Sequence, residues 1–416
     1  MDRVIGRSFS TVPPLASALG RSFSTVFPHA TVLHSLPPPL ARAALGRSSF
    51  STSSTVSPPA SKYYDRKTID FCLFNLPNLI KTTLSASDSG IDSSTIALTL
   101  NSAESFVSTW AHVDPVLDRV ENEPKFDPKL CRVFMPPQSK DLLSAYTSSG
   151  FASLHDGSLP HVVACAVEAI MAGAFTSGVL GHSVLTACAA RLLALHGSQD
   201  LKDVYHGPMI EGRWGGTMAL SETQAGSSLQ DITTKATRTA TKGEYRIKGK
   251  KMWTSGCDHD MTENIIHMLL AKSAEDGKVS LFLVPSFLVV EDKSNPGQHK
   301  IGRRNDITIG GLNHKMGHRG ISNCYWNLGE EGDGAVGFLV GTEGKGLQAM
   351  MAMMNDMRVH VGLGASAAGM RGYLESLTYA IERRQGRHVG GGGAGRLAAA
   401  MRRGEDRRYP SSSTKT

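Results

Sequence analysis

One segment of the sequence brings small residues and hydroxyl groups together at a spacing that could bind a ligand. Residues 218–227 read MALSETQAGS, an apolar run that ends in a loop of small residues. Gly226 would let a ligand approach the backbone closely, and Ser221 and Ser227 offer hydroxyl groups for hydrogen bonds. Taken alone, this segment could equally be an ordinary loop.

A second segment, about 25 residues further on, adds an aromatic face to the same chemistry. Residues 249–256 read GKKMWTSG, which predicts a strand that delivers the indole of Trp253 and the hydroxyl of Ser255. Flat rings stack on indole, and hydroxyl groups satisfy the polar edges of a heterocycle. The two segments together suit a planar, hydrogen-bonding heterocycle that carries phosphate.

Hydrophobic periodicity predicts the elements that position these segments. Apolar residues recur every three or four positions from Val162 to Met171, and the stretch from Val179 to Leu195 is apolar nearly all round, which indicates two helices. From Gly207 the pattern changes to short apolar or alternating runs between turn-forming residues, which favours an antiparallel sheet or a small barrel. The predicted strands span residues 214–220, 235–240, 244–247, 265–271 and 279–284.

The helical period returns near Gly344 and continues to Ile381. After Arg387 a glycine- and arginine-rich run leads to a serine-rich end that cannot bury a core. Helices, then strands, then helices predict an α+β fold. The predicted organisation is a transit or disordered segment at 1–60, a helical domain at 63–206, a central β-domain at 207–342, part of a helical domain at 343–388 and a disordered tail at 389–416.

Composition excludes several classes of protein. Hydrophobic residues make up 40% and charged residues 19% of the chain, as in globular proteins. The net charge of +7 sits at the ends, because residues 1–62 and 387–416 each carry +5 and the body carries −3, so no nucleic-acid partner is expected. No window approaches the ~20 apolar residues of a membrane-spanning helix. The six cysteines form no CxxC pair, so neither a metal site nor a disulfide framework is predicted.

The first sixty residues have the composition of an organellar targeting segment. Residues 3–62 are rich in Ser, Arg, Ala and Pro and contain no acidic residue. The phrase GRSFSTV starts at Gly6 and again at Gly20, and a looser copy starts at Gly46. We expect a mitochondrial transit peptide that is cleaved near residues 50–60, with a plastid address or a disordered arm as the alternatives.

In combination, the two segments resemble the acyl-CoA dehydrogenase family, whose members carry a Thr/Ser-Glu-Pro-x-Ala-Gly-Ser loop followed by a Lys-x-Trp/Phe-Ile-Thr strand. Thr223 stands where Pro is usual, and Ser221 and Ser255 replace threonines. The resemblance covers roughly residues 155–388. It extends to the runs FLVGTEGKGL at 338–347, NDMR at 355–358 and ERRQGR at 382–387, and HDMTENI at 259–265 is similar to the branch that contains 3-methylmercaptopropionyl-CoA dehydrogenases.

This resemblance implies a helical N-terminal domain, a central antiparallel β-domain and the start of a C-terminal helical bundle. It implies FAD as the cofactor, an acyl-CoA thioester as the substrate and an electron-transfer flavoprotein as the electron acceptor, usually in a homo-oligomer. The implied reaction is FAD-dependent α,β-dehydrogenation. The chain would therefore be an oxidoreductase of fatty acid metabolism.

The same resemblance assigns roles to individual residues. Ser221 would bond the pyrimidine edge of the flavin, Trp253 would flank the isoalloxazine, and Ser255 would approach its reactive edge. Arg383 and Gln385 would hold the FAD diphosphate of a neighbouring subunit. The full implied set is Met218, Leu220, Ser221, Gly226, Ser227, Trp253, Ser255, Arg383 and Gln385 for the cofactor, and Ser227, Asn355 and Arg358 for the substrate.

The family reaction also needs a buried carboxylate as general base, and the sequence does not provide one. In most members this base is a glutamate late in the C-terminal bundle, beyond this sequence, and in some it precedes the arginine that Arg358 resembles. Met357 stands there and cannot accept a proton, and one residue of offset turns Asp356 about 100° around the helix. No catalytic residue is predicted, and we expect a C-terminally truncated member with impaired turnover.

Three functional interpretations stay open at this point. The first is a truncated acyl-CoA dehydrogenase, the second a non-catalytic paralogue or isoform that binds acyl-CoA or joins full-length subunits, and the third an acyl-CoA oxidase. The sequence ends in Thr-Lys-Thr rather than the Ser-Lys-Leu peroxisomal address, which disfavours the oxidase. Asn355 and Arg358 could instead lie on a solvated helix face.

Overall fold

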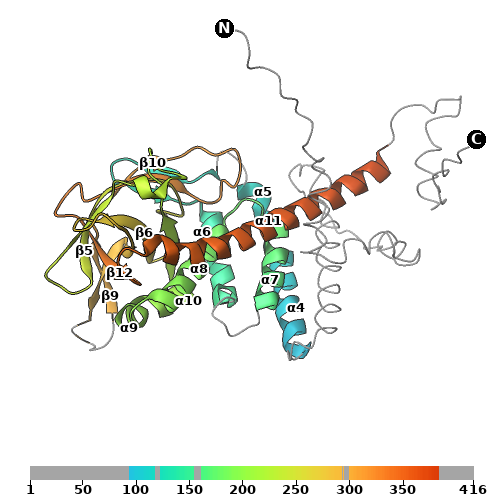
Figure 1. Ribbon diagram of the computed structural model, residues 1–416. Coiled ribbons are helices and arrows are strands. Elements are labelled where there is room, and N and C mark those ends of the chain that lie inside the picture. The colour runs from blue at the N-terminus through green and yellow to red at the C-terminus, as the bar shows by residue number, and fades with distance from the viewer. Residues whose placement is uncertain (1–92, 118–121, 154–160, 293, 295–298, 384–416) are drawn as a thin grey trace, which may run out of the picture. The chain divides into compact units, whose positions relative to one another are not determined.

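The computed structural model describes residues 93–117, 122–153, 161–292, 294 and 299–383 (Figure 1). The chain divides into two compact units, one of residues 65–376 and one of residues 1–64 with 377–416. Of the second unit, only Leu377 to Arg383 are described. The predicted transit segment, the predicted C-terminal tail and Gln385 lie outside the described residues, and the predicted domain boundaries stay predictions.

Helices of the larger unit precede its sheet and pack around an apolar core. Phe106 of the first described helix contacts the rings of Tyr146, Phe151 and Phe175, and Val163 and Val167 are buried in the same cluster. The two helices predicted from periodicity are confirmed as α7 and α8. The described helices before the sheet are α4 (Ser93–Trp110), α5 (Asp114–Leu117), α6 (Pro137–Ser148), α7 (His161–Ala174), α8 (Gly181–His196), α9 (Gln199–Leu201) and α10 (Gly207–Ile210).

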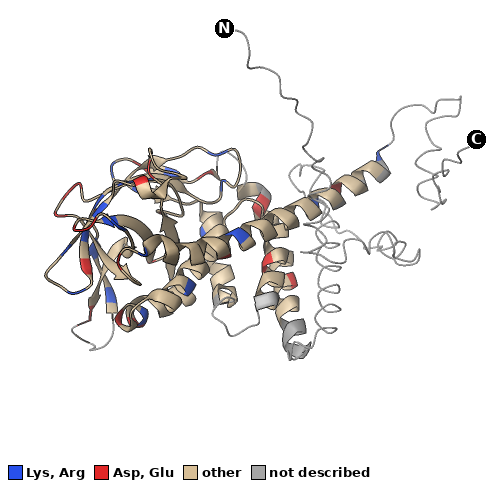
Figure 2. Cartoon of the chain, viewed as in Figure 1, with Lys and Arg blue, Asp and Glu red and all other residues tan. Residues whose placement is uncertain are grey.

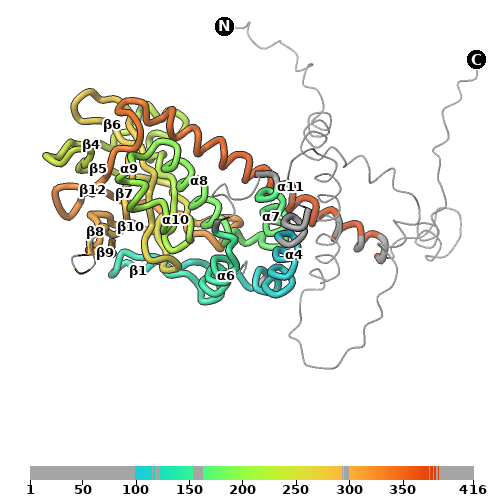
Figure 3. The backbone as a smooth tube through the Cα atoms, turned by 90° about the horizontal axis from the view of Figure 1, so that it is seen from below, coloured from blue at the N-terminus to red at the C-terminus, as the bar shows by residue number. Residues whose placement is uncertain are grey.

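The central sheet has eight strands, and α8 packs against its strand β3. Figure 3, seen from below, shows α8 beside the strands of this sheet. Its strands are β3 (Trp214–Ala219), β4 (Lys235–Arg238), β5 (Glu244–Ser255), β6 (Asn264–Ser273), β7 (Val279–Pro285), β10 (Ile307–Leu312), β11 (Asn323–Leu328) and β12 (Ala335–Val340). The strand order is β10-β11-β5-β12-β7-β6-β3, with β4 between β5 and β6. The α+β class is therefore confirmed.

One detail of this sheet differs from the sequence prediction, which was an antiparallel sheet or small barrel. β3 and β4 each run parallel to β6, whereas the other strand pairs are antiparallel. The first strand starts at Trp214, as predicted, and the Gly207–Ile210 turn before it is still helical. A separate hairpin pairs β8 (Phe287–Glu291) with β9 (His299–Arg304).

A short hairpin also interrupts the predicted helical domain. β1 (Lys125–Asp127) pairs with β2 (Arg132–Phe134), and Val133 and Met135 are buried with Trp326 in the core of the sheet. Three-residue strands are too short to show an alternating pattern, which is why periodicity did not reveal them. The hairpin thus belongs by packing to the sheet and not to the helices beside it in sequence.

The last described helix, α11 (Gly346–Glu382), crosses α8 and α7 within the larger unit. Asp356 pairs with Arg191 of α8 at 3.5 Å, His360 bonds Glu168 of α7, and Arg371 donates to the carbonyl oxygens of Gly173 and Ala174. Figure 2 shows that few residues of α11 are charged. No described helix is long and apolar enough to cross a membrane, and the described residues hold no group of three or more metal-ligating side chains.

Candidate functional site

A bulge in β5 turns Trp253 out of the sheet. Thr254 pairs with Cys324 and Lys251 with Trp326, so two residues of β5 lie opposite the single residue Tyr325 of β11. Trp253 takes the left-handed backbone conformation, with a φ of 62°, and 61% of its surface is exposed. Bulges redirect side chains next to active sites, and a left-handed bulky residue is rare enough to indicate a functional constraint. The indole is available as a stacking surface.

The loop after β3 lies against this bulge. The backbone N–H of Met252 donates to the carbonyl of Ser221 at 3.0 Å, and the Thr217 hydroxyl donates to the carbonyl of Ser255 at 2.5 Å. These two bonds bring the end of β3 to the end of β5. Ser221 therefore lies beside the strand end that carries Trp253 and Ser255, although about 30 residues separate them in the sequence.

A buried ion pair fixes the shape of that loop. Lys251 donates to Glu222 at 3.0 Å, and both side chains are almost fully buried. The Glu222 carboxylate also accepts the backbone N–H and the hydroxyl of both Thr233 and Thr234, at 2.6–3.1 Å. Glu222 and Ala225 exchange two backbone hydrogen bonds, which closes a tight turn before Gly226. The turn presents residues 226 and 227 to solvent.

Electrostatics keep both members of this pair charged at neutral pH. Burial alone would raise the pKa of Glu222, but Lys251 and the threonine hydrogen bonds outweigh it and lower the pKa to about 2. Burial lowers the pKa of Lys251 to about 8, although the Glu222 carboxylate opposes that shift. The pair therefore acts as a buried, charged anchor under the loop.

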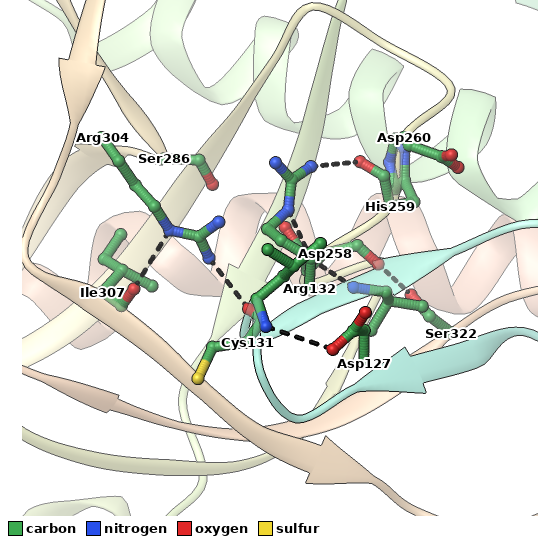
Figure 4. A network of polar contacts seen from close by, with 12 residues as sticks. Asp127, Cys131, Arg132, Asp258, His259, Asp260, Ser286, Arg304, Ile307 and Ser322 are labelled. Atoms are coloured by element: carbon green, nitrogen blue, oxygen red, sulfur yellow. Dashed lines mark hydrogen bonds and ion pairs between the residues drawn. The ribbon is translucent and has the colours of Figure 1, made fainter.

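A second polar network holds the segment that follows the bulge (Figure 4). The Asp258 carboxylate accepts from the Arg132 guanidinium at 2.9 Å and from the backbone N–H of Val133 at 2.7 Å. The carbonyl of Asp258 accepts from the Ser322 hydroxyl at 2.9 Å, and Arg304 donates to the carbonyl of Cys131. These contacts tie the β1–β2 hairpin to the ends of β5 and β11.

Comparison with known proteins identifies this region. The family model for the acyl-CoA dehydrogenase middle domain matches residues 217–330, which include the loop, the bulge and the anchor beneath them. This region is therefore similar to an acyl-CoA dehydrogenase middle domain.

The relatives of this middle domain bear out the resemblance. A butyryl-CoA dehydrogenase of Syntrophomonas wolfei is 36% identical over 54% of this chain and 37% of its own length. A 3-methylmercaptopropionyl-CoA dehydrogenase of Ruegeria pomeroyi is 36% identical over 62% of this chain and 44% of its own. The chain thus spans less than half the length of these curated relatives.

The fold agrees with the sequence comparison. The crystal structure of an acyl-CoA dehydrogenase from Bacillus anthracis, complexed with FAD, superposes with a TM-score of 0.56 over 72% of this chain and 47% of that chain, at 19% identity. Helices before a central sheet, and a long helix after it, are therefore the acyl-CoA dehydrogenase arrangement, as predicted.

The structure places the predicted cofactor residues of the middle segment on β3, on the loop after it and on the bulged end of β5. Met218 on β3 and Leu220 beyond it pack in one apolar cluster with Met354 and Met357 of α11, so the loop and this helix share a core. Trp253 and Ser255 lie at the bulged end of β5, Ser221 lies beside it, and Gly226 and Ser227 are at the exposed end of the same loop. Their cofactor roles remain predictions.

The other predicted residues lie away from this cluster in the chain. Arg383 follows the end of α11 and belongs to the second compact unit, and Gln385 is outside the described residues. Asn355 and Arg358 are exposed on α11, where the guanidinium donates to the Asn355 side chain at 2.8 Å. That exposure is compatible with substrate binding and also with the solvated face considered from the sequence.

Two residues of the anchor were missed as site residues. Glu222 and Lys251 stand inside the recognised runs but were not predicted as site residues. The alternation of side chains along β5 could have revealed the burial of Lys251, because Lys251 lies on the same face of the strand as the buried Tyr245 and Ile247. A lysine on a buried face requires a buried carboxylate, and Glu222 is the acidic residue in the facing loop.

Three buried histidines near the same strands should make stability depend on pH. Burial lowers the pKa of His259 to about 4 and that of His267 to about 3, and it holds the pKa of His182 well below its usual value. His182 and His259 pack edge to face with ring centroids 4.5 Å apart. They also line a cavity of ≈ 20 Å³, enough for about one water molecule.

Acidification should therefore destabilise the fold, and His259→Gln should weaken this dependence. In the unfolded chain His259 binds a proton near pH 6.5, whereas in the folded chain it does so only near pH 4. The free energy of unfolding that the neutral His259 contributes is therefore fully present above pH 6.5 and is lost as the pH falls towards 4. Between those values, denaturant unfolding of His259→Gln should show a slope lower by about 1.4 kcal/mol per pH unit. His299→Gln, at an exposed position on β9, is the control and should keep the wild-type slope.

Proposed function

We propose that this chain binds FAD at the bulge of β5 and serves FAD-dependent α,β-dehydrogenation of an acyl-CoA thioester. The observation that carries the proposal is the exposed Trp253 in its left-handed conformation, joined by hydrogen bonds to the loop of Ser221. An added Cβ at Gly226 would meet no atom within 4 Å, so the loop leaves open space for a ligand. The residues present fit a flat, polar cofactor.

Each residue has a role that follows from its chemistry. FAD supplies the hydride acceptor when it is bound. Trp253 offers an aromatic face for stacking, while Ser221 and Ser255 offer hydroxyl groups to the polar edges of the ring. Ser227 lies at the exposed end of the turn, where its hydroxyl could bond the phosphate groups of FAD or the acyl-CoA substrate.

Residues distant from the bulge complete the proposal. Asn355 and Arg358 of α11 suit the acyl-CoA, with the guanidinium held by the asparagine. Arg383 and Gln385 suit a diphosphate in a neighbouring subunit of a homo-oligomer, because a guanidinium matches paired phosphate oxygens. An electron-transfer flavoprotein is the proposed acceptor.

Titration of the full chain with FAD tests the cofactor site. Binding should quench the fluorescence of Trp253, because an indole stacked on a flavin transfers its excitation. Trp253→Ala should weaken FAD binding by about fivefold, since an aromatic stacking contact contributes about 1 kcal/mol. Trp110→Ala, at a partly buried site in the helical core, controls for loss of an indole elsewhere. Wild-type protein that binds no FAD would refute the proposal.

Binding without dehydrogenation is the second candidate, and two residues of α11 favour it. Met357, at the position where some family members carry the base, packs into the apolar cluster beneath the loop. The neighbouring carboxylate of Asp356 is paired with Arg191 at 3.5 Å. Met357 therefore cannot accept a proton, and the Asp356 carboxylate beside it is engaged in an ion pair.

The visible spectrum of the FAD-loaded chain separates the two candidates. Loss of the flavin absorbance after addition of acyl-CoA thioesters would establish dehydrogenation. A changed but unbleached spectrum would establish binding alone. An unchanged spectrum would refute acyl-CoA binding under either candidate.

We also propose a mitochondrial location for this protein. The acid-free, Ser- and Arg-rich composition of residues 3–62 supports it, and a plastid address has a similar composition. Import into isolated mitochondria, with cleavage near residues 50–60, is the expected outcome. Import into plastids alone would contradict it.

A further inference from the structure

Asn323, the first residue of β11, contacts both residues on which the proposed flavin site depends. Its side-chain nitrogen donates to the Ser255 hydroxyl oxygen at 3.0 Å and to the Trp253 carbonyl oxygen at 3.3 Å. Its side-chain oxygen accepts from Asn313 at 2.8 Å. A carbonyl oxygen can only accept, so the amide nitrogen must be the atom that faces Trp253.

We propose that Asn323 is a positioning residue that holds Trp253 on the bulge and aims the Ser255 hydroxyl at a bound flavin. This inference rests on the proposed function. Asn323 does not need to touch the flavin, because it acts through the two residues that would.

The direction of the hydrogen bonds determines what Ser255 can do. Asn323 donates to the Ser255 oxygen, so this bond uses a lone pair of that oxygen and leaves the hydroxyl hydrogen free of Asn323. The hydrogen can then be donated to an acceptor on a ligand. An aspartate at position 323 would reverse this arrangement, because a carboxylate accepts the hydroxyl hydrogen and draws it away from the ligand.

The hold on Trp253 matters because its backbone conformation is unfavourable for a bulky residue. A left-handed φ of 62° persists only where surrounding contacts enforce it, and the exposed indole makes few such contacts. The bond from Asn323 to the Trp253 carbonyl acts directly on the bulged peptide. Asn323 thus constrains the backbone of one flavin-facing residue and the side chain of the other.

Asn323 is itself held from both sides. Its carbonyl accepts the backbone N–H of Asn313 at 2.7 Å, in addition to the side-chain bond between these two residues. The preceding residue, Ser322, accepts the N–H of Gly256 and donates its hydroxyl to Asp258, within the network of Figure 4. A shift of Asn323 would therefore break several bonds at once.

The surroundings of Asn323 also leave room for a smaller side chain without disturbing the packing of the fold. Asn313, Ser322 and Asn323 line a cavity of ≈ 160 Å³, which reaches Lys315 and Arg319. Shortening Asn323 enlarges a space that is already open and polar, so Asn323→Ala should fold.

The first test needs no flavin. The chain has four tryptophans, so the ¹⁵N-labelled full chain should show four indole signals, and Trp253→Phe assigns one of them. In Asn323→Ala, the heteronuclear NOE of the Trp253 indole should fall while the other three stay unchanged. Asn327→Ala is the matched control, since Asn327 lies on the same strand and bonds the exposed Glu330. An unchanged Trp253 signal in Asn323→Ala overturns the proposal whether or not FAD binds.

The second test measures FAD affinity. Asn323→Asp should weaken binding more than tenfold and more than Asn323→Ala does, although aspartate has almost the size of asparagine. A residue that only filled space would show the opposite order. Equal affinities for the wild type and both variants overturn the proposal. Wild-type protein without FAD affinity refutes the proposed function instead, and the indole signals still decide whether Asn323 holds Trp253.

Discussion

Gly346→Ala is expected to lower the free energy of unfolding by about 3 kcal/mol or more. A Cβ at this position would overlap the backbone of Ser280 and Leu281 on β7, where α11 begins. Backbone atoms inside a sheet cannot move aside as a flexible side chain can, so helix and strand must separate. The neighbouring Gly344 donates its N–H to the Ser280 hydroxyl at 2.8 Å, and this bond would be lost with the separation.

The same helix supplies a control for this prediction. Gly362 has no neighbour within 4 Å of its added Cβ and is exposed. Gly362→Ala should raise the free energy of unfolding by up to about 1 kcal/mol, because alanine favours the helix over glycine. Urea unfolding of Gly346→Ala, Gly362→Ala and the wild type measures the difference in their free energies of unfolding. Equal stability of Gly346→Ala and wild type would show that α11 does not rest on β7 as described.

The effect of Gly346→Ala should also reach the loop after β3. Met350 and Met353 of α11 are buried in the cluster that Met218 and Leu220 join. Lifting the helix from β7 would open this cluster under the loop. The variant should therefore bind FAD more weakly than Gly362→Ala does.

Periodicity was sufficient to predict the order of helices, strands and helices, but not the parallel pairing of β3 and β4 with β6. The regular spacing from Val162 to Met171 and the change of pattern after Gly207 came from the burial of one face of each element, and this burial is a local property of the sequence. The β1–β2 hairpin was missed, because its position against Trp326 depends on contacts more than a hundred residues away in the chain. Such contacts leave no periodic trace.

Candidate site residues could be proposed from the sequence, but their geometry could not, and their roles remain predictions. Ser221, Trp253 and Ser255 were found because they stand in recognisable runs. The bulge was not, since a left-handed tryptophan contradicts the ordinary preference of bulky residues and arises from the register between β5 and β11. Asn323 was missed for the same reason, because its role depends on which strand pairs with β5.

The anchor beneath the loop gives the second large expected effect. Glu222→Gln should destabilise the fold by about 3–5 kcal/mol, because it leaves the Lys251 ammonium buried without a counter-charge. The Lys251 side chain has no exposed surface, and its other partner is the carbonyl of Leu220 at 2.9 Å. Lys278→Met is the control, since Lys278 and Asp276 form an exposed pair whose loss should cost less than about 1 kcal/mol.

A double-mutant cycle shows whether the cost comes from the unpaired charge. Lys251→Met in the Glu222→Gln background removes the stranded ammonium and should recover at least about 1 kcal/mol of the loss. Additive effects of the two substitutions would contradict the coupling. The recovered double variant should still bind FAD more weakly than wild type, because the carboxylate that holds Thr233 and Thr234 is gone. The double variant would then regain part of its stability without regaining FAD affinity. That result is expected if the Glu222–Lys251 anchor shapes the loop in addition to stabilising the fold.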